Sequence, residues 1–183
     1  MNLPPNLILV GFMGSGKTST GRVLAAKMGF EFIDTDQVLE SEAGLTIREI
    51  FRVHGEPAFR AMEVGLLERL TARDRQVIAT GGGFWMAEAI RTRLLQVGFC
   101  VWLRTGEAQT WERVRGDLPS RPLLSRDPDP ERKIRELIAA RTPAYSQAHA
   151  SVDTDGKTPK AVAGEIGILL KERHPFDLPP LPA

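Results

Sequence analysis

Short runs rich in apolar residues alternate with amphipathic stretches along most of the chain. Five runs predict buried strands, at residues 7–10, 31–33, 76–79, 99–103 and 151–153. The stretches between them carry apolar residues three and four positions apart, which is the spacing of helices that bury one face. Strands that alternate with helices form a parallel sheet covered on both faces. We therefore predict an α/β fold in three layers, α/β/α, with ligands at the carboxyl ends of the strands.

Glycines and capping residues indicate where the helices begin and end. A helix over residues 20–28 should end at Gly29, because glycine favours the left-handed conformation of a C-cap. Thr46 followed three residues later by Glu49 has the spacing of a capping box, and Gly55 should break the helix that begins there. The remaining predicted helices cover residues 37–44, 56–70, 87–97, 107–115, 131–141 and 159–172.

Two proline-rich segments interrupt this alternation. Residues 116–130 hold four prolines with charges between them, are not predicted to be helical, and form a long connection typical of a mobile lid. Residues 174–183 hold four more prolines and predict an extended or frayed tail. We therefore expect one domain over residues 1–173, with a lid at about 116–130, followed by the tail.

The first strand runs into the most specific motif of the sequence. Residues 11–18 read Gly-Phe-Met-Gly-Ser-Gly-Lys-Thr, which matches Gly-x-x-x-x-Gly-Lys-Thr between a strand and a helix. Glycines let successive backbone N–H groups turn toward one point, and the helix directs its positive dipole end there. Lys17 adds a full charge. The motif predicts a site for the polyphosphate of a nucleotide.

The amino-acid composition indicates which kinds of molecule the protein binds. The 183 residues carry 24 Lys and Arg against 23 Asp and Glu, and this balance gives no indication of binding to nucleic acid or an anionic membrane. The single cysteine, Cys100, lies in a predicted buried strand and suits a core thiol in a reducing compartment. No apolar stretch approaches the roughly 18 residues of a membrane span. We expect a cytoplasmic monomer that acts on small molecules.

Two aspartates at the end of the second strand are candidates for catalysis. A phosphate loop works with Mg²⁺, whose usual ligands are the loop hydroxyl, here Thr18, and a carboxylate that ends a neighbouring strand. The third strand ends in glycines, so Asp34 is the best placed acid, although it could instead cap the next helix. Asp36 is our candidate for orienting an acceptor hydroxyl and taking its proton.

Glycines and arginines form a second set of candidates. Three glycines in succession, residues 81–83, indicate either a backbone that closely approaches a ligand or a tight turn. Arg60 and Arg141 are ordinary surface ion-pair residues when each is taken alone, but together they could clamp a carboxylate. Arg121, in the predicted lid, is either a solvated charge or a group that folds over the phosphates.

Six motifs, in the order of the chain, resemble those of the shikimate kinase family between about residue 6 and about residue 170. They are Gly11–Thr18 followed by Gly21-Arg22, Asp34-Thr-Asp36, Phe59-Arg60-Ala-Met-Glu63, Thr80-Gly-Gly-Gly83, Arg121-Pro-Leu-Leu124 and Arg141-Thr-Pro-Ala-Tyr145. The resemblance implies a P-loop kinase fold like that of nucleoside monophosphate kinases, with a five-stranded parallel sheet and a closing lid. It implies transfer of the γ-phosphate of ATP to the 3-hydroxyl of shikimate, giving shikimate 3-phosphate and ADP in aromatic amino acid biosynthesis.

The resemblance also implies roles for the matching residues. Lys17, Asp36 and Arg121 would be catalytic, and Thr18 and Asp34 would hold Mg²⁺. ATP would be bound by Gly14, Ser15, Gly16, Lys17, Thr18, Ser19 and Arg121, and shikimate by Asp36, Arg60, Gly82, Gly83 and Arg141, with both arginines on its carboxylate. The resemblance leaves the adenine contacts open, with Arg113 or Arg115 and residues near Asp155 as the candidates.

Two other functions fit the phosphate loop. One is a kinase of another small metabolite, such as a sugar acid or a nucleoside monophosphate, which a panel of acceptors would separate from a shikimate kinase. The other is a regulatory module that binds ATP without turnover. The presence of Asp36, Arg60 and Arg141 beside an intact Lys17 argues against such a module, because it has no acceptor to bind.

Overall fold

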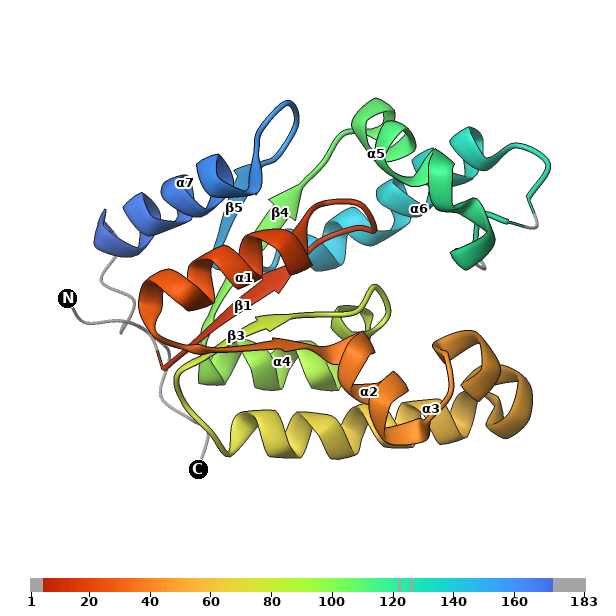
Figure 1. The fold of residues 1–183 in the computed structure, drawn as a ribbon, viewed down its shortest axis with the longest axis horizontal. Coiled ribbons are helices and arrows are strands. Elements are labelled where there is room, and N and C mark those ends of the chain that lie inside the picture. The colour runs from red at the N-terminus through yellow and green to blue at the C-terminus, as the bar shows by residue number, and fades with distance from the viewer. Residues whose placement is uncertain (1–4, 122, 126, 173–183) are drawn as a thin grey trace.

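Five parallel strands form one sheet at the centre of the molecule (Figure 1). The computed structural model describes residues 5–121, 123–125 and 127–172. The strands are β1 (Asn6–Val10), β2 (Glu31–Asp34), β3 (Gln76–Ala79), β4 (Phe99–Arg104) and β5 (Ala150–Asp153). Their order in the sheet is β2-β3-β1-β4-β5, so β1 pairs with β3 on one side and with β4 on the other. The predicted five-stranded parallel sheet is confirmed.

Helices cover both faces of this sheet and complete the three predicted layers (Figure 1). They are α1 (Lys17–Met28), α2 (Thr35–Ala43), α3 (Ile47–Thr71), α4 (Glu88–Val97), α5 (Glu107–Val114), α6 (Pro130–Tyr145) and α7 (Pro159–Glu172), with 3₁₀ helices η1 (Phe84–Met86) and η2 (Arg115–Ser120). Helices α1 and α7 pack on one face, and α3, α4 and α6 pack on the other.

The side chains of β1 alternate between these two packing layers. Leu7 and Leu9 lie in the cluster that α1 and α7 cover, whereas Ile8 and Val10 lie in the cluster on the opposite face. All four side chains are fully buried. A central strand of a parallel sheet is buried on both faces, which explains why β1 reads as a continuous apolar run instead of an alternating one.

The predicted capping residues occupy the expected places. Gly29 is the C-cap of α1 in the left-handed conformation, with φ 65°. Thr46 and Glu49 form a reciprocal capping box at the start of α3. Gly55, with φ 78° and ψ 172°, interrupts the helical backbone inside α3, so the predicted break is confirmed as a kink between two helical segments. These local signals fix where α1 ends and where α3 begins and bends.

Two boundaries differ from the prediction. The segment 116–130 was predicted to lack helix, but residues 115–120 form η2, because short 3₁₀ turns tolerate glycine and proline that a regular helix excludes. The predicted helix 131–141 is longer and continues to Tyr145 through Pro143. Near a helix C-terminus a proline removes a single backbone hydrogen bond, here to Ala139, and this loss does not end α6.

Three further predictions concern Cys100, membrane-spanning helices and the C-terminal tail. Cys100 is fully buried, as predicted for a core thiol. No helix in the described part of the chain has the length and apolar character needed to cross a membrane. The predicted tail at residues 174–183 lies outside the described residues.

Candidate functional site

The phosphate loop connects β1 to α1 at the carboxyl edge of the sheet. Gly16, with φ 85°, is the left-handed N-cap of α1, so the N–H groups of the first turn point into the loop. The Lys17 ammonium donates to the carbonyl oxygens of Gly11 at 2.8 Å and Phe12 at 2.9 Å. Burial lowers the pKa of Lys17 to about 8, against the raising effect of nearby carboxylates. The loop therefore presents N–H dipoles and a cation from one continuous segment.

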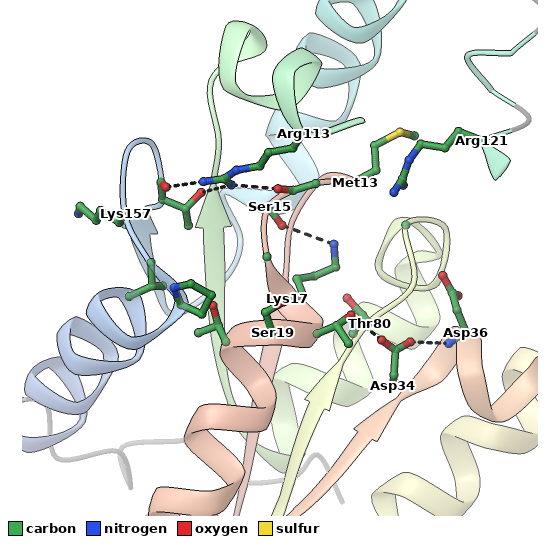
Figure 2. Close-up of a pocket in the computed structure, with 18 residues that line it drawn as sticks. Met13, Ser15, Lys17, Ser19, Asp34, Asp36, Thr80, Arg113, Arg121 and Lys157 are labelled. Atoms are coloured by element: carbon green, nitrogen blue, oxygen red, sulfur yellow. Dashed lines mark hydrogen bonds between the residues drawn. The ribbon is translucent and has the colours of Figure 1, made fainter. Parts of the chain in front are cut away.

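A cavity of about 510 Å³ opens over this loop. Figure 2 shows Lys17 in the middle of this view, with Arg113 and Arg121 above it and the two aspartates below. The predicted nucleotide and metal residues Gly14–Ser19, Asp34, Asp36 and Arg121 all line the cavity. The cavity is therefore lined by residues from the ends of β1 and β2 and from the predicted lid.

Asp34 uses its two carboxylate oxygens for different partners. Oδ2 accepts a hydrogen bond of 2.7 Å from the Thr18 hydroxyl. Oδ1 accepts from the backbone N–H groups of Asp36 at 3.2 Å and Gln37 at 3.4 Å, which caps α2. The helix cap, which is the alternative to a magnesium role for Asp34, is present, and Oδ2 is directed at the Thr18 hydroxyl of the phosphate loop.

The Thr18–Asp34 pair fits Mg²⁺. Hydroxyl and carboxylate oxygens are the hard ligands that this ion prefers, and they lie together in the cavity of the phosphate loop. Among the described residues no group of three or more His, Cys, Asp and Glu side chains could hold a metal. In kinases, Mg²⁺ is typically shared between one or two protein oxygens and the phosphates of the substrate.

Asp36 lies against the glycine turn that follows β3. A Cβ added at Gly81 would meet Asp36 Oδ1 at 1.8 Å, so the carboxylate occupies space that any other residue at position 81 would fill. The Gly81 N–H donates to the Thr35 hydroxyl at 2.7 Å, which fixes the turn against the start of α2. Burial, with the Asp34 carboxylate as the second cause, raises the pKa of Asp36 to about 6. The glycine turn therefore admits a buried carboxylate that can hold or accept a proton.

Both predicted arginines reach the same turn from different helices. Arg141 Nη1, on α6, donates to the Gly82 carbonyl at 3.1 Å, and its guanidinium lies over the Phe12 ring. A Cβ added at Gly83 would lie 3.3 Å from Arg60 Nη1, on α3. The turn thus brings two guanidinium groups and the Asp36 carboxylate together, although residues 36, 60 and 141 are far apart in the sequence.

Arg60 also forms ion pairs, which are the alternative to a role in clamping a substrate carboxylate. Its guanidinium lies 3.0 Å from exposed Glu56 and 2.7 Å from Glu63, whose side chain is only 2% exposed. Burial raises the pKa of Glu63, and the Arg60 hydrogen bond opposes that rise. Glu63 belongs to one of the six family motifs, but the sequence alone gives it no role. Its position three residues after Arg60, on the same helix face, is the signal that could have identified it as the partner of Arg60.

Arg121 lines the cavity and lies 3.6 Å from Asp117 in η2, so it has an acidic neighbour and also faces the phosphate loop.

The two candidates for the adenine end have different surroundings. Arg113 lines the cavity and donates to the carbonyl oxygens of Gly14 at 2.9 Å and Thr154 at 2.8 Å. Arg115 pairs with Glu112 at 3.0 Å and is 58% exposed. The structure therefore places Arg113 in the cavity.

The sequence indicates the far end of the cavity only as residues near Asp155, without naming those that line it. Thr154, Lys157, Pro159 and Val162, from the β5–α7 connection and the start of α7, line it. Lys157 is held by Glu165 at 2.8 Å. No motif singles out these residues, because the sheet order alone brings β5 beside β4 and carries them to this edge.

Comparisons with known proteins agree with this geometry. The sequence matches the family model for shikimate kinase over residues 13–171. It is 45% identical over 170 residues to the shikimate kinase of Symbiobacterium thermophilum, covering 92% of this chain and 97% of the relative. It is 43% identical over 161 residues to that of Thermodesulfovibrio yellowstonii, with coverages of 88% and 92%.

Solved structures give the same result. The chain superimposes with a TM-score of 0.86 on shikimate kinase from Acinetobacter baumannii in complex with shikimate, at 39% sequence identity. The match covers 92% of this chain and 94% of the solved one. Sequence and structure therefore agree on one family over nearly the whole described chain.

Proposed function

The chain belongs to the shikimate kinase family, and we propose how its residues perform the reaction of that family. The enzyme transfers the γ-phosphate of ATP to the 3-hydroxyl of shikimate and forms shikimate 3-phosphate and ADP. The observation that carries the proposal is the glycine turn after β3, where Asp36, Arg60 and Arg141 meet beside the phosphate loop.

The phosphate loop binds the β- and γ-phosphates. Residues 14–19 line the cavity, with the first-turn N–H groups of α1 facing the loop, and Lys17 supplies the charge that follows the transferring phosphoryl group. Arg121 reaches the same phosphates from the lid and stabilises the charge that develops during transfer. Thr18 and Asp34 would hold Mg²⁺, which neutralises and orients the phosphates when bound.

Asp36 orients the acceptor hydroxyl and accepts its proton. Its buried carboxylate lies between the phosphate loop and the glycine turn, which is where an acceptor must lie for in-line attack on the γ-phosphate. A raised pKa brings a carboxylate closer to the pH at which it can accept a proton during transfer.

Arg60 and Arg141 bind the carboxylate of shikimate, and the backbone of Gly82 and Gly83 contacts its ring. Two guanidinium groups beside one turn suit a carboxylate better than a neutral sugar. Glu56 is exposed, so a substrate carboxylate can replace it at Arg60 at small cost, while buried Glu63 keeps the guanidinium in place.

We also propose that residues 1–173 act as one domain and a monomer, in which the segment 116–130 closes over bound nucleotide. Arg121 supports this closure, because it joins that segment to the cavity. Hydrogen exchange in residues 116–121 should slow when ATP and shikimate bind. Exchange that is already slow and unaffected by ligands would contradict a closing lid.

An acceptor panel tests the function. ADP release from Mg-ATP is measured with shikimate, its methyl ester, gluconate and AMP. We expect strong stimulation by shikimate, a much weaker effect of the ester, which lacks the negative charge, and background hydrolysis with the other two. No stimulation by shikimate would overturn the function, whereas equal rates with shikimate and its ester would overturn the role of the two arginines.

A further inference from the structure

One buried arginine lies behind the acceptor site without touching it. Arg91, on α4, is 8% exposed. Its Nη1 donates to the carbonyl oxygens of Trp85 and Met86, each at 3.2 Å, and its Nε donates to Gln147 Oε1 at 2.8 Å. It forms no ion pair with any acid in the part of the chain that the structure describes. Its partners are therefore neutral oxygens from two separate elements.

Burial of a guanidinium beside neutral oxygens is a costly way to stabilise a fold. A buried cation is normally paired with a carboxylate, and an apolar side chain of the same volume often stabilises a core as well or better. The planar guanidinium offers donors in fixed directions, which an apolar side chain cannot do. The arrangement thus favours a role in geometry, namely holding two backbone segments at a set separation.

The segments that Arg91 joins are two of those that build the acceptor site. Trp85 and Met86 belong to η1, which begins directly after the Gly81–Gly83 turn. Gln147 follows α6, the helix that carries Arg141. A second link runs parallel to the first, because the fully buried Trp85 donates its indole N–H to the Ala144 carbonyl of α6 at 2.9 Å. A third contact, from Arg141 to the Gly82 carbonyl, lies at the site itself.

We propose that Arg91 is a positioning residue for the acceptor site, which keeps the glycine turn and Arg141 in register. The inference rests on the proposed function, because it takes Gly82, Gly83 and Arg141 as the groups that bind shikimate. Arg91 acts with Trp85 from behind η1. Loss of either link lets η1 shift relative to α6 and loosens the acceptor site, while the phosphate loop, built on β1 and α1, keeps its geometry.

The test compares the affinities of the folded enzyme for its two substrates. Shikimate and ADP binding are measured separately by calorimetry for the wild type, Arg91→Met and Arg91→Lys. We expect Arg91→Met to raise the Kd of shikimate about tenfold and that of ADP less than twofold. Arg91→Lys, which keeps the charge but not the planar donors, should lie between Arg91→Met and the wild type. Arg93→Met, an exposed arginine of the same helix, is the matched control and should change neither affinity.

Thermal unfolding of the same variants separates positioning from stability. If Arg91→Met lowers the melting temperature but leaves the shikimate Kd of the folded enzyme unchanged, or raises both Kd values equally, the proposal is wrong. If that variant does not fold, Arg91→Lys and Trp85→Phe carry the test, and Trp85→Phe should raise the shikimate Kd about threefold through loss of one hydrogen bond. A wild-type enzyme that does not bind shikimate, or an Arg141→Met variant with unchanged shikimate affinity, would instead contradict the proposed function.

Discussion

The two halves of the site are built in different ways. The phosphate loop is one continuous segment, residues 11–18, and its ligand groups are mostly backbone N–H groups at the start of α1. The acceptor half gathers side chains from α2, α3 and α6 around the backbone of the glycine turn after β3. A cradle made of backbone depends on local conformation, whereas a pocket made of distant side chains depends on how the helices pack. Changes in the two halves should therefore damage different substrates.

The largest effect should come from Lys17→Met. Removing the cation beside the transferring phosphoryl group should lower kcat at least about 10³-fold, because this interaction strengthens as charge develops in the transition state. Shikimate binding, measured by calorimetry, should stay within about twofold of the wild type. Lys27→Met, at the exposed end of α1, is the control and should keep full activity. A large loss of shikimate affinity in Lys17→Met would show that the halves are not separable.

Gly81→Ala should be nearly as damaging, although it adds one methyl group. Its Cβ would meet Asp36 Oδ1 at 1.8 Å, so the Asp36 carboxylate must rotate away. We expect kcat to fall about 100-fold, as for a displaced general base, with little loss of stability, because the end of a side chain can move at low cost. Steady-state kinetics and thermal unfolding of the same preparation check both parts.

Gly65→Ala is the matched control for that substitution. A Cβ at this exposed position of α3 would meet no atom within 4 Å. Alanine in a helix interior should stabilise the fold by roughly 0.5–1 kcal/mol relative to glycine and leave activity unchanged. Equal loss of activity in both variants would mean that crowding of Asp36 is not the cause.

Arg60→Met should affect the acceptor alone. Loss of a charge-assisted hydrogen bond to the substrate carboxylate should raise the KM for shikimate roughly 10- to 100-fold and leave the KM for ATP near its wild-type value. Arg69→Met, on the same helix and paired with Glu42, is the control. The role assigned to Arg60 would be refuted by an unchanged KM for shikimate.

The smallest effect, and the most selective one, is expected for Asp34→Asn. Asparagine caps a helix about as well as aspartate, so the free energy of unfolding should change by less than about 0.5 kcal/mol. The Mg²⁺ concentration for half-maximal activity should rise at least about tenfold, because the carboxylate beside Thr18 loses its charge. Unfolding curves and a magnesium titration measure the two roles of this residue separately. A destabilised variant with an unchanged magnesium requirement would show that Asp34 acts only as the N-cap of α2.

The same contrast explains what could be predicted from the sequence. The phosphate loop, the cap at Gly29 and the capping box at Thr46 are local patterns, and each has the predicted place in the structure. Arg60 and Arg141 could not be placed together by spacing alone, because they belong to α3 and α6, which are far apart in the sequence. The motif order supplied by the family resemblance brought them together, and the structure now gives a physical reason in the glycine turn.

The parts that were missed depend on tertiary packing. Arg91 lies four residues after Ala87 and three before Leu94, on the inward face of α4, but this spacing does not reveal which groups pair with its guanidinium. Arg113 and Arg115 are two residues apart and equally basic, so only the packing of α5 distinguishes the arginine in the cavity from the exposed one. Residues 116–120 are predicted as a loop because glycine and proline signal breaks, although short 3₁₀ turns accept both.

The position of β1 in the sheet has a consequence for synthesis of the protein. This strand is synthesised before its partners, which are residues 76–79 of β3 and 99–102 of β4. Such distant pairing is slow, and until it occurs the segment Leu7–Val10 is an apolar stretch with no partner strand in the nascent chain. The phosphate loop directly follows that strand. Affinity for nucleotide should therefore be acquired only after β4 has been translated, although the motif responsible is made well before that strand.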